Sequence, residues 1–271
     1  MDQRLADLLT LLELEQLEVD LFRGESRDIG SPQVFGGQVL GQALTAASAT
    51  VEGRIVHSLH AYFLRPGKND ASTTLRVERL RDGRSFSTRT VVACQDDEPI
   101  FTVTASFHKD EPGGDFATPI ATDVPGPDDL ADSQTELSRT LWGEDSPFER
   151  LEVPEYSHTR QSPTPRRAMW IRSRAALPDD PGLHACVITF LSDMGVLAAV
   201  RAARSGSERP AMAASLDHAV WFHRPARADE WLLFDVAARS SASSRGLGIG
   251  TMHTLGGVHA VTVGQEGLVR L

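Results

Sequence analysis

The sequence predicts an α+β fold in which one structural plan occurs twice along the chain. Each copy begins with a long apolar helix, at 38–49 and at 183–203, and continues with four short runs whose apolar and polar residues alternate as in antiparallel strands. A long connection rich in prolines and acidic residues joins the two copies. A helix that is apolar on most sides must be covered, so we expect each antiparallel sheet to wrap around its helix.

The first copy is expected in residues 1–109, the N-terminal domain. Leucines at helical spacing near the start of the chain predict a short amphipathic helix ahead of the helix at 38–49. The dipeptide Asp82-Gly83 is typical of a tight hairpin turn. The strands of this copy are predicted at Ile55–Leu64, Thr73–Arg81, Ser85–Ala93 and Pro99–Phe107.

The connecting segment is expected at 110–165, and the second copy at 166–271, the C-terminal domain. Gly256-Gly257 predicts the turn of its last hairpin. The strands of this copy are predicted at Ala213–Phe222, Trp231–Ala238, Arg245–Thr254 and Val258–Val269.

An internal duplication accounts for the repeated plan. Residues 56–108 align without a gap on residues 215–267, an offset of 159 positions, and the dipeptide Arg65-Pro66 falls on Arg224-Pro225. Identities are few, but strand lengths and turns agree along the whole alignment. An antiparallel sheet that curves around a long helix is the hotdog fold, so the sequence predicts a double hotdog.

Composition excludes several classes of protein. The net charge of −10, with a pI near 5.4, argues against a general nucleic-acid or anionic-membrane binder. The longest apolar stretch, 183–200, contains His184 and Asp193, which favours a buried helix over a membrane span. Two cysteines about ninety positions apart form neither a disulfide framework nor a metal-ligand cluster. With no targeting signal expected, a reducing, cytoplasmic location fits best.

Several long motifs connect the chain to a known family. QVFGGQVLGQAL at 33–44, HSLHAYFLRPG at 57–67 and LDHAVWFHRP at 216–225 closely resemble the type II acyl-CoA thioesterases, as do shorter motifs at 79–89, 240–246 and 265–270. The resemblance implies a double hotdog that hydrolyses fatty acyl-CoA, of medium to long chain, through an activated water and without a cofactor. It also implies a homo-oligomer, a dimer or tetramer of double hotdogs.

Asp193 is the first candidate catalytic residue, because it is the single acidic residue in a long apolar stretch. Burying a carboxylate is costly, so Asp193 either caps or kinks its helix or has a raised pKa that suits a general base. The resemblance assigns Asp193 to orienting and activating the hydrolytic water. It assigns Ser215 and Gln265 as the two other groups that bind this water, although each residue by itself reads as a solvated polar side chain.

His218 suggests a Ser-His-Asp relay with Ser215 and Asp217. Strand alternation places Ser215 and Asp217 on one face and His218 on the other, so we do not expect the relay. Since the first copy has no carboxylate at the position that corresponds to Asp193, one working site per chain is expected, at the interface of the two hotdogs.

Substrate-binding residues are predicted less sharply. Gly36 and Gly37 open the first helix, where they either let substrate approach the backbone or only form a turn. Val39 and Met194 would line an acyl tunnel, although both are also ordinary core residues. The CoA phosphates would meet Arg84 within one of two arginine clusters, either of which could instead be a solvated face: Arg79, Arg81, Arg84 and Arg89, or Arg160, Arg166 and Arg167.

Two other functions stay open. The first is a binding or sensing protein for acyl-CoA whose site has lost catalysis. The second is a hotdog enoyl-CoA hydratase, which needs an aspartate–histidine pair on a loop. The nearest pair here, Asp217-His218, lies in a predicted strand.

Overall fold

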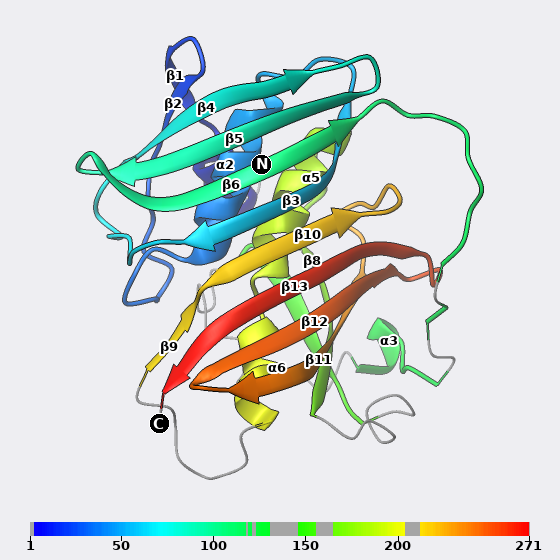
Figure 1. Ribbon diagram of the computed structural model, residues 1–271. Helices are drawn as coiled ribbons and strands as arrows, with labels where there is room; N and C mark the ends of the chain where they lie inside the picture. Colours follow the sequence, from blue (N-terminus) through cyan, green and yellow to red (C-terminus); the bar gives the residue numbers. More distant parts are fainter. Residues whose placement is uncertain are drawn as a thin grey trace.

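All strands that the structure describes join one antiparallel sheet that curves around the helices (Figure 1). The computed structural model describes residues 3–117, 119–120, 123–130, 146–155, 165–203 and 212–270. Within these residues the strand order is β1-β2-β4-β5-β6-β3-β10-β13-β12-β11-β8-β7, and β9 pairs with β13. The two halves of the sheet meet where β3 pairs with β10.

The first half follows the predicted plan. Its helix and four main strands are confirmed to within a few residues at their ends, and Gly83 forms the expected turn by donating its N–H to the carbonyl of Phe86. A short hairpin of β1 and β2 extends the sheet beyond the prediction. The elements are α1 (Gln3–Leu12), β1 (Glu15–Glu18), β2 (Leu21–Gly24), α2 (Gly36–Ser48), β3 (Ile55–Phe63), β4 (Thr73–Asp82), β5 (Phe86–Gln95) and β6 (Glu98–His108).

The second half repeats this plan with additions. Two strands that the sequence did not predict, β7 and β8, extend the far edge of the sheet beside β11. The elements are α3 (Pro127–Leu130), β7 (Phe148–Val153), β8 (Arg166–Ser173), α5 (Pro181–Ser192), α6 (Val196–Ala203), β9 (Met212–Ser215), β10 (Asp217–Phe222), β11 (Leu232–Ala242), β12 (Arg245–Thr254) and β13 (His259–Arg270).

Two predicted elements are each broken in two. The single helix expected at 183–203 is wrong, because Gly195 takes a positive φ of 135° that helix geometry does not allow and α5 ends before it. The single strand expected at 213–222 is also wrong, since Leu216 separates β9 from β10. Both interruptions lie beside a candidate catalytic residue.

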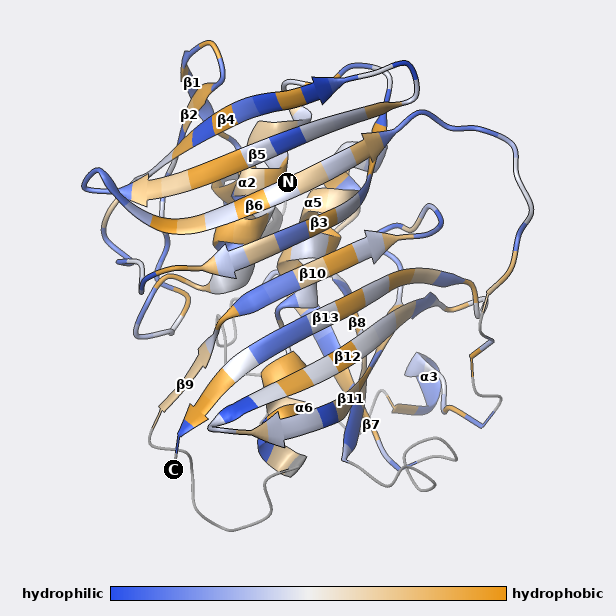
Figure 2. Ribbon diagram, viewed as in Figure 1, coloured by the Kyte–Doolittle hydropathy of each residue, from blue (hydrophilic) through white to orange (hydrophobic). Residues whose placement is uncertain are grey.

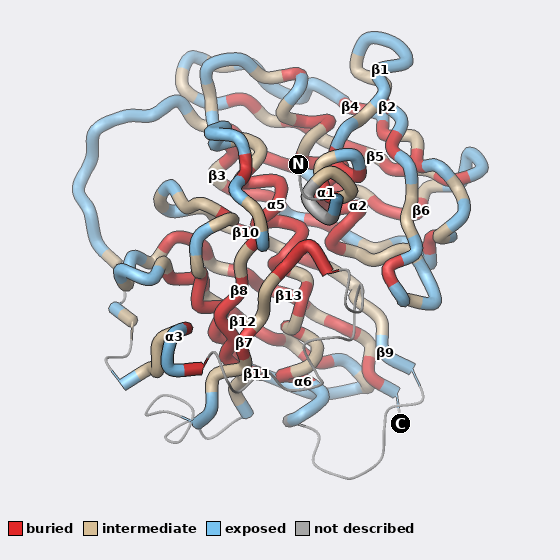
Figure 3. Tube along the Cα trace, turned by 180° about the vertical axis from the view of Figure 1, so that it is seen from behind, coloured by how far each residue is buried: buried red, intermediate tan, exposed pale blue. Residues whose placement is uncertain are grey.

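The helices form the core. α2 packs against the strands of the first half, and α6 packs against β11, β12 and β13 of the second. α5 runs antiparallel to α2, with Gly37 beside the Phe190 carbonyl and Gly41 near that of Cys186. Figure 2 shows hydrophobic segments on α2 and α6 and along the strands in front of them, and Figure 3 shows much of α2 and α5 as buried. This is the predicted double hotdog.

The span 181–202 is long and apolar enough to cross a membrane by length and composition. Within the protein, 72% of its most apolar window is buried. Its burial against α2 and the sheet identifies it as a core helix, as the sequence predicted.

The two halves are related by an approximate twofold axis. In the central strand pair His60 faces Ala219, which is the residue 159 positions after it. The offset between the two copies therefore coincides with the register of the β3–β10 pair. It follows that each end of the antiparallel α2–α5 pair has a counterpart at the other end.

Candidate functional site

Asp193 lies where the two halves of the protein meet. It caps the C-terminus of α5, and Gly195 turns the chain immediately afterwards into α6. Its side chain is only 6% exposed. The N–H of Gly37, in the first turn of α2, donates a hydrogen bond to the Asp193 carboxylate. An orphan amide and the positive end of the α2 dipole therefore face a buried carboxyl group from the other half.

Gln265 on β13 joins Asp193 to Ser215. Its Nε2 donates to Oδ1 of Asp193 at 2.6 Å and to Oγ of Ser215 at 2.8 Å. Gln265 is fully buried, and its Oε1 has no hydrogen-bond partner within the described part of the chain. The structure thus brings together the three predicted catalytic residues around one amide, with an acceptor atom still available.

His218 also faces this site, which corrects the sequence prediction. Ser215 is the last residue of β9, and the break at Leu216 shifts the alternation before β10 begins. Ser215 and His218 consequently both point inward, and Nδ1 of His218 lies 3.9 Å from Oδ1 of Asp193. Asp217 instead accepts a hydrogen bond from the Glu266 N–H, so the aspartate and histidine of this dipeptide have separate partners.

Hydrogen bonds to Ser192 define the tautomer of His218. The Ser192 hydroxyl donates its one proton to the Thr189 carbonyl, and it also lies 2.7 Å from Nε2 of His218. His218 must then donate from Nε2, which leaves Nδ1 as an acceptor on the side of Asp193. The sequence reasoning missed this role for Ser192 and His218, because no local pattern marks a strand break at Leu216.

The electrostatics of the site favour a neutral histidine beside a carboxyl group that titrates near neutrality. Burial raises the pKa of Asp193 to about 7, against the opposing effect of hydrogen bonds from Gln265 and Gly37. Burial lowers the pKa of His218 to about 3, so its ring is uncharged at neutral pH. Asp193 is therefore the group here whose pKa suits a general base.

Two glycines allow this close approach. A Cβ on Gly36 would lie 2.7 Å from Oδ2 of Asp193, and one on Gly37 would lie 2.4 Å from the Phe190 carbonyl oxygen. Larger residues at either position would push the N-terminus of α2 away from α5. Both predicted glycines are thus placed at the site, where the Gly37 amide donates to the Asp193 carboxylate and Gly36 lies beside it.

The other predicted substrate residues lie elsewhere. Val39 and Met194 are buried members of the hydrophobic core. Arg84 is exposed at the β4–β5 turn, beside the opposite end of α2. Most remaining arginines of the two clusters have acidic partners: Asp20 for Arg79, Asp82 for Arg89, Asp235 for Arg166 and Glu152 for Arg167, whereas Arg160 lies outside the described residues.

The arrangement can hold and deprotonate a water molecule. It offers a carboxylate base, a hydroxyl group, an amide carbonyl and an imidazole acceptor within one buried cluster, next to the N-terminus of α2. In the ranges that the structure describes, no group of three or more His, Cys, Asp or Glu side chains could hold a metal ion.

Comparisons with known proteins identify the family of this chain. Family models described as "Acyl-CoA thioesterase N-terminal domain" and "Acyl-CoA thioesterase" match residues 23–108 and 149–268. Human acyl-coenzyme A thioesterase 8 is 35% identical over 100% of this chain and 91% of its own length. Acyl-CoA thioesterase 2 of Haemophilus influenzae is 34% identical over 100% of this chain and 99% of its own length.

The fold agrees as well. The crystal structure of the acyl-CoA thioesterase II TesB2 from Mycobacterium marinum superposes with a TM-score of 0.84, at 38% identity over 96% of this chain and 97% of that one. Two family models match in chain order, and full-length relatives are more than 30% identical, so the family of the chain is established. The chain belongs to the acyl-CoA thioesterase family.

Proposed function

We propose that this protein hydrolyses fatty acyl-CoA to a free fatty acid and CoA by direct attack of a water molecule that Asp193 activates. The observation that carries the proposal is the buried Asp193–Gln265–Ser215 cluster at the N-terminus of α2. A thioester carbonyl is already electrophilic, so a well-positioned water and a base of matched pKa suffice.

The proposed reaction has two steps. In the first, water held by Ser215 and by Oε1 of Gln265 attacks the carbonyl carbon while its proton passes to the Asp193 carboxylate. In the second, the tetrahedral intermediate expels the CoA thiolate, which takes the proton from Asp193 and leaves as the thiol. The fatty acid is thereby formed, and Asp193 returns to its ionised resting form.

The developing oxyanion needs fixed donors. The dipole of α2 favours negative charge at its N-terminus, where the N–H of Gly37 points toward Asp193. Gly36 and Gly37 leave this end of the helix without a side chain that would block the thioester. In the same scheme His218 places a neutral ring with an acceptor nitrogen beside the water that Asp193 activates.

Finer parts of the proposal are a preference for medium to long acyl chains, a homo-oligomeric assembly and a cytoplasmic location. The alternative of a non-catalytic acyl-CoA binding protein is weakened by the intact cluster. A hydratase is weakened by the separate partners of Asp217 and His218.

The test is release of CoA thiol from a panel of saturated acyl-CoAs, from butyryl-CoA to stearoyl-CoA, by wild type and by Asp193→Asn. We expect turnover by wild type, a loss of at least about a hundredfold in the variant, and a maximum among the longer chains. Binding of the panel by folded wild type without turnover would refute the proposal and favour the binding protein.

A further inference from the structure

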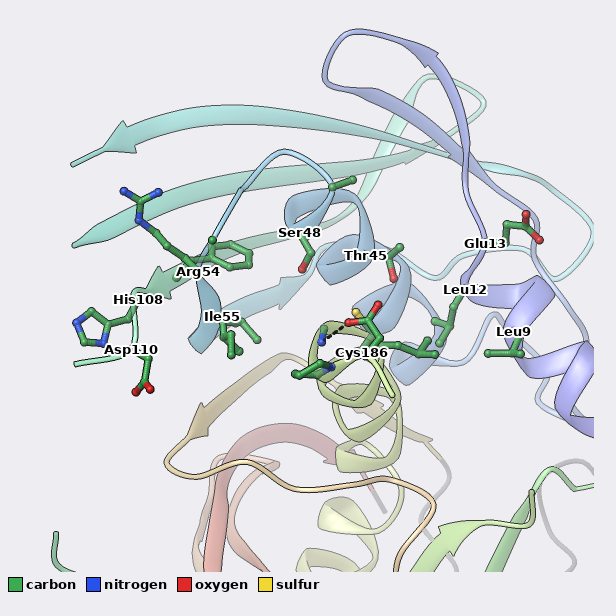
Figure 4. A pocket seen from close by; sticks show the side chains of 18 residues that line it. Leu9, Leu12, Glu13, Thr45, Ser48, Arg54, Ile55, His108, Asp110 and Cys186 are labelled. Atoms are coloured by element: carbon green, nitrogen blue, oxygen red, sulfur yellow. Dashed lines mark hydrogen bonds between the residues drawn. The ribbon is translucent and has the colours of Figure 1, made fainter. Parts of the chain in front are cut away.

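The twofold relation between the halves places a second pocket at the opposite end of the α2–α5 pair from Asp193 (Figure 4). It has a volume of about 700 Å³, within the range of small-molecule binding sites. The C-terminus of α2, the N-terminus of α5, the start of β3 and the end of β6 line it. These are the counterparts of the elements that surround Asp193.

The ends of the two helices correspond to one another. Gly37 in the first turn of α2 matches Gly182 in the first turn of α5, and Asp193, the C-cap of α5, matches Ala49, the C-cap of α2. The offset that relates the strands does not apply to these helices, because α5 rather than α6 pairs with α2. Asp193 therefore corresponds to the C-terminal end of α2, at Ser48 and Ala49, and not to the Val34–Gly37 segment that the sequence alignment suggested.

The catalytic groups are missing from this second pocket. Ser215 corresponds to Val56, and Gln265 corresponds to Ser106, whose hydroxyl is 2.8 Å from Nε2 of His57. With Ala49 in place of Asp193, no base stands at the position where a water would be activated. A thioester that bound here would not be hydrolysed.

One wall of the pocket fits an acyl chain. Leu9, Leu12 and Cys186 form an apolar wall, and Thr45 and Ser48 of α2 lie beside it (Figure 4). Glu13 and Asp180 also line this wall, and the Asp180 carboxylate accepts a hydrogen bond from the N–H of Gly182.

The opposite side of the pocket carries the cations. Arg54 lines it together with His108 and Asp110, and its buried Nε has no hydrogen-bond partner in the described chain. The Arg54 guanidinium donates to the carbonyl of Arg84, and the Lys109 N–H donates to the neighbouring Ser85. The backbones of Arg84 and Lys109 therefore lie close to Arg54, whose guanidinium would meet a phosphate at the mouth of the pocket.

We propose that this pocket is a second acyl-CoA site that binds the substrate without hydrolysing it. The inference rests on the proposed function for the identity of the ligand. It agrees with the position of Arg84, which the sequence assigned to the CoA phosphates and whose carbonyl accepts a hydrogen bond from Arg54 of this pocket.

The test is the binding stoichiometry of a long-chain S-alkyl-CoA thioether, which lacks the carbonyl that is hydrolysed. Isothermal titration calorimetry of the full chain should give two molecules bound per chain. Ser48→Trp fills the pocket from its α2 side and should reduce this to one, with hydrolysis at low substrate concentration retained. Ser72→Trp, the same change at an exposed residue outside the pocket lining, should still bind two.

The outcomes separate the two claims. One molecule per chain on an actively hydrolysing wild type, or two on Ser48→Trp, overturns the second site and leaves the proposed function standing. Absence of hydrolysis by wild type overturns the proposed function, whereas the stoichiometry with and without Ser48→Trp still decides whether the second pocket binds acyl-CoA.

Discussion

The buried carboxyl group of Asp193 should make the stability of the folded protein depend on pH in an unusual direction. Burial raises its pKa from 3.8 to about 7, a shift of about three units. Each unit corresponds to about 1.4 kcal/mol, so ionising Asp193 in the folded state costs about 4 kcal/mol. Asp193→Asn removes this charge and keeps an oxygen that can accept the hydrogen bond from Gln265.

The direction in which the unfolding free energy changes with pH follows from proton binding. Between about pH 4 and pH 7 the folded protein holds a proton on Asp193 that the unfolded chain has released, so the contribution to stability falls as pH rises. It is complete below about pH 4 and lost above about pH 7. Relative to Asp193→Asn, the wild type should therefore lose about 4 kcal/mol of unfolding free energy across this window and change little beyond it.

Urea unfolding of both proteins at a series of pH values measures this difference directly. Asp70→Asn, the same substitution at an exposed aspartate in the loop before β4, is the matched control, and its unfolding free energy should stay parallel to that of wild type. Parallel curves for wild type and Asp193→Asn would refute the raised pKa of the buried carboxyl group.

Three other perturbations test the geometry of the site. Gln265→Leu should lower kcat on the order of a hundredfold by releasing the water. It should also move the midpoint of the pH–rate profile above about 7, because the hydrogen bond from Gln265 to Asp193 holds the pKa of that carboxyl group down in wild type. Gly37→Ala should lower the unfolding free energy measured in urea by about 1–3 kcal/mol, because its Cβ would meet the Phe190 carbonyl oxygen. Gly114→Ala, at a position with open space around it, should leave the unfolding free energy almost unchanged. Equal losses in the two variants would count against the close helix contact. His218→Gln should lower kcat yet leave the pH–rate midpoint near 7, since burial keeps the imidazole uncharged at that pH; a displaced midpoint would show that the histidine itself titrates in the reaction.

Sequence periodicity was enough for the repeated plan of the fold. The strands of both halves and the helix α2 follow from alternation and helical spacing, which are local properties. The β1–β2 hairpin and the strands β7 and β8 were missed, since short strands at a sheet edge carry little periodic signal. The break of the long helix at Gly195 was missed as well, because glycine in an apolar stretch does not reveal the sign of its φ.

The candidate site was only partly predictable for a related reason. The resemblance pointed to Asp193, Ser215 and Gln265, and the structure brings all three together. The contact between Gly37 and Asp193 crosses the interface of the two halves, so no local pattern encodes it. His218 was placed on the wrong face because a one-residue interruption of a strand reverses the alternation after it.

The central claim is that water attacks the thioester directly, with Asp193 as its base. A single turnover in ¹⁸O-labelled water, with enzyme in excess over a long-chain acyl-CoA, tests it most directly. The account predicts that the fatty acid from this first turnover carries the label and that Asp193 carries none. An unlabelled fatty acid from the first turnover would contradict the account, because its new oxygen would then have come from the Asp193 carboxylate through a covalent intermediate.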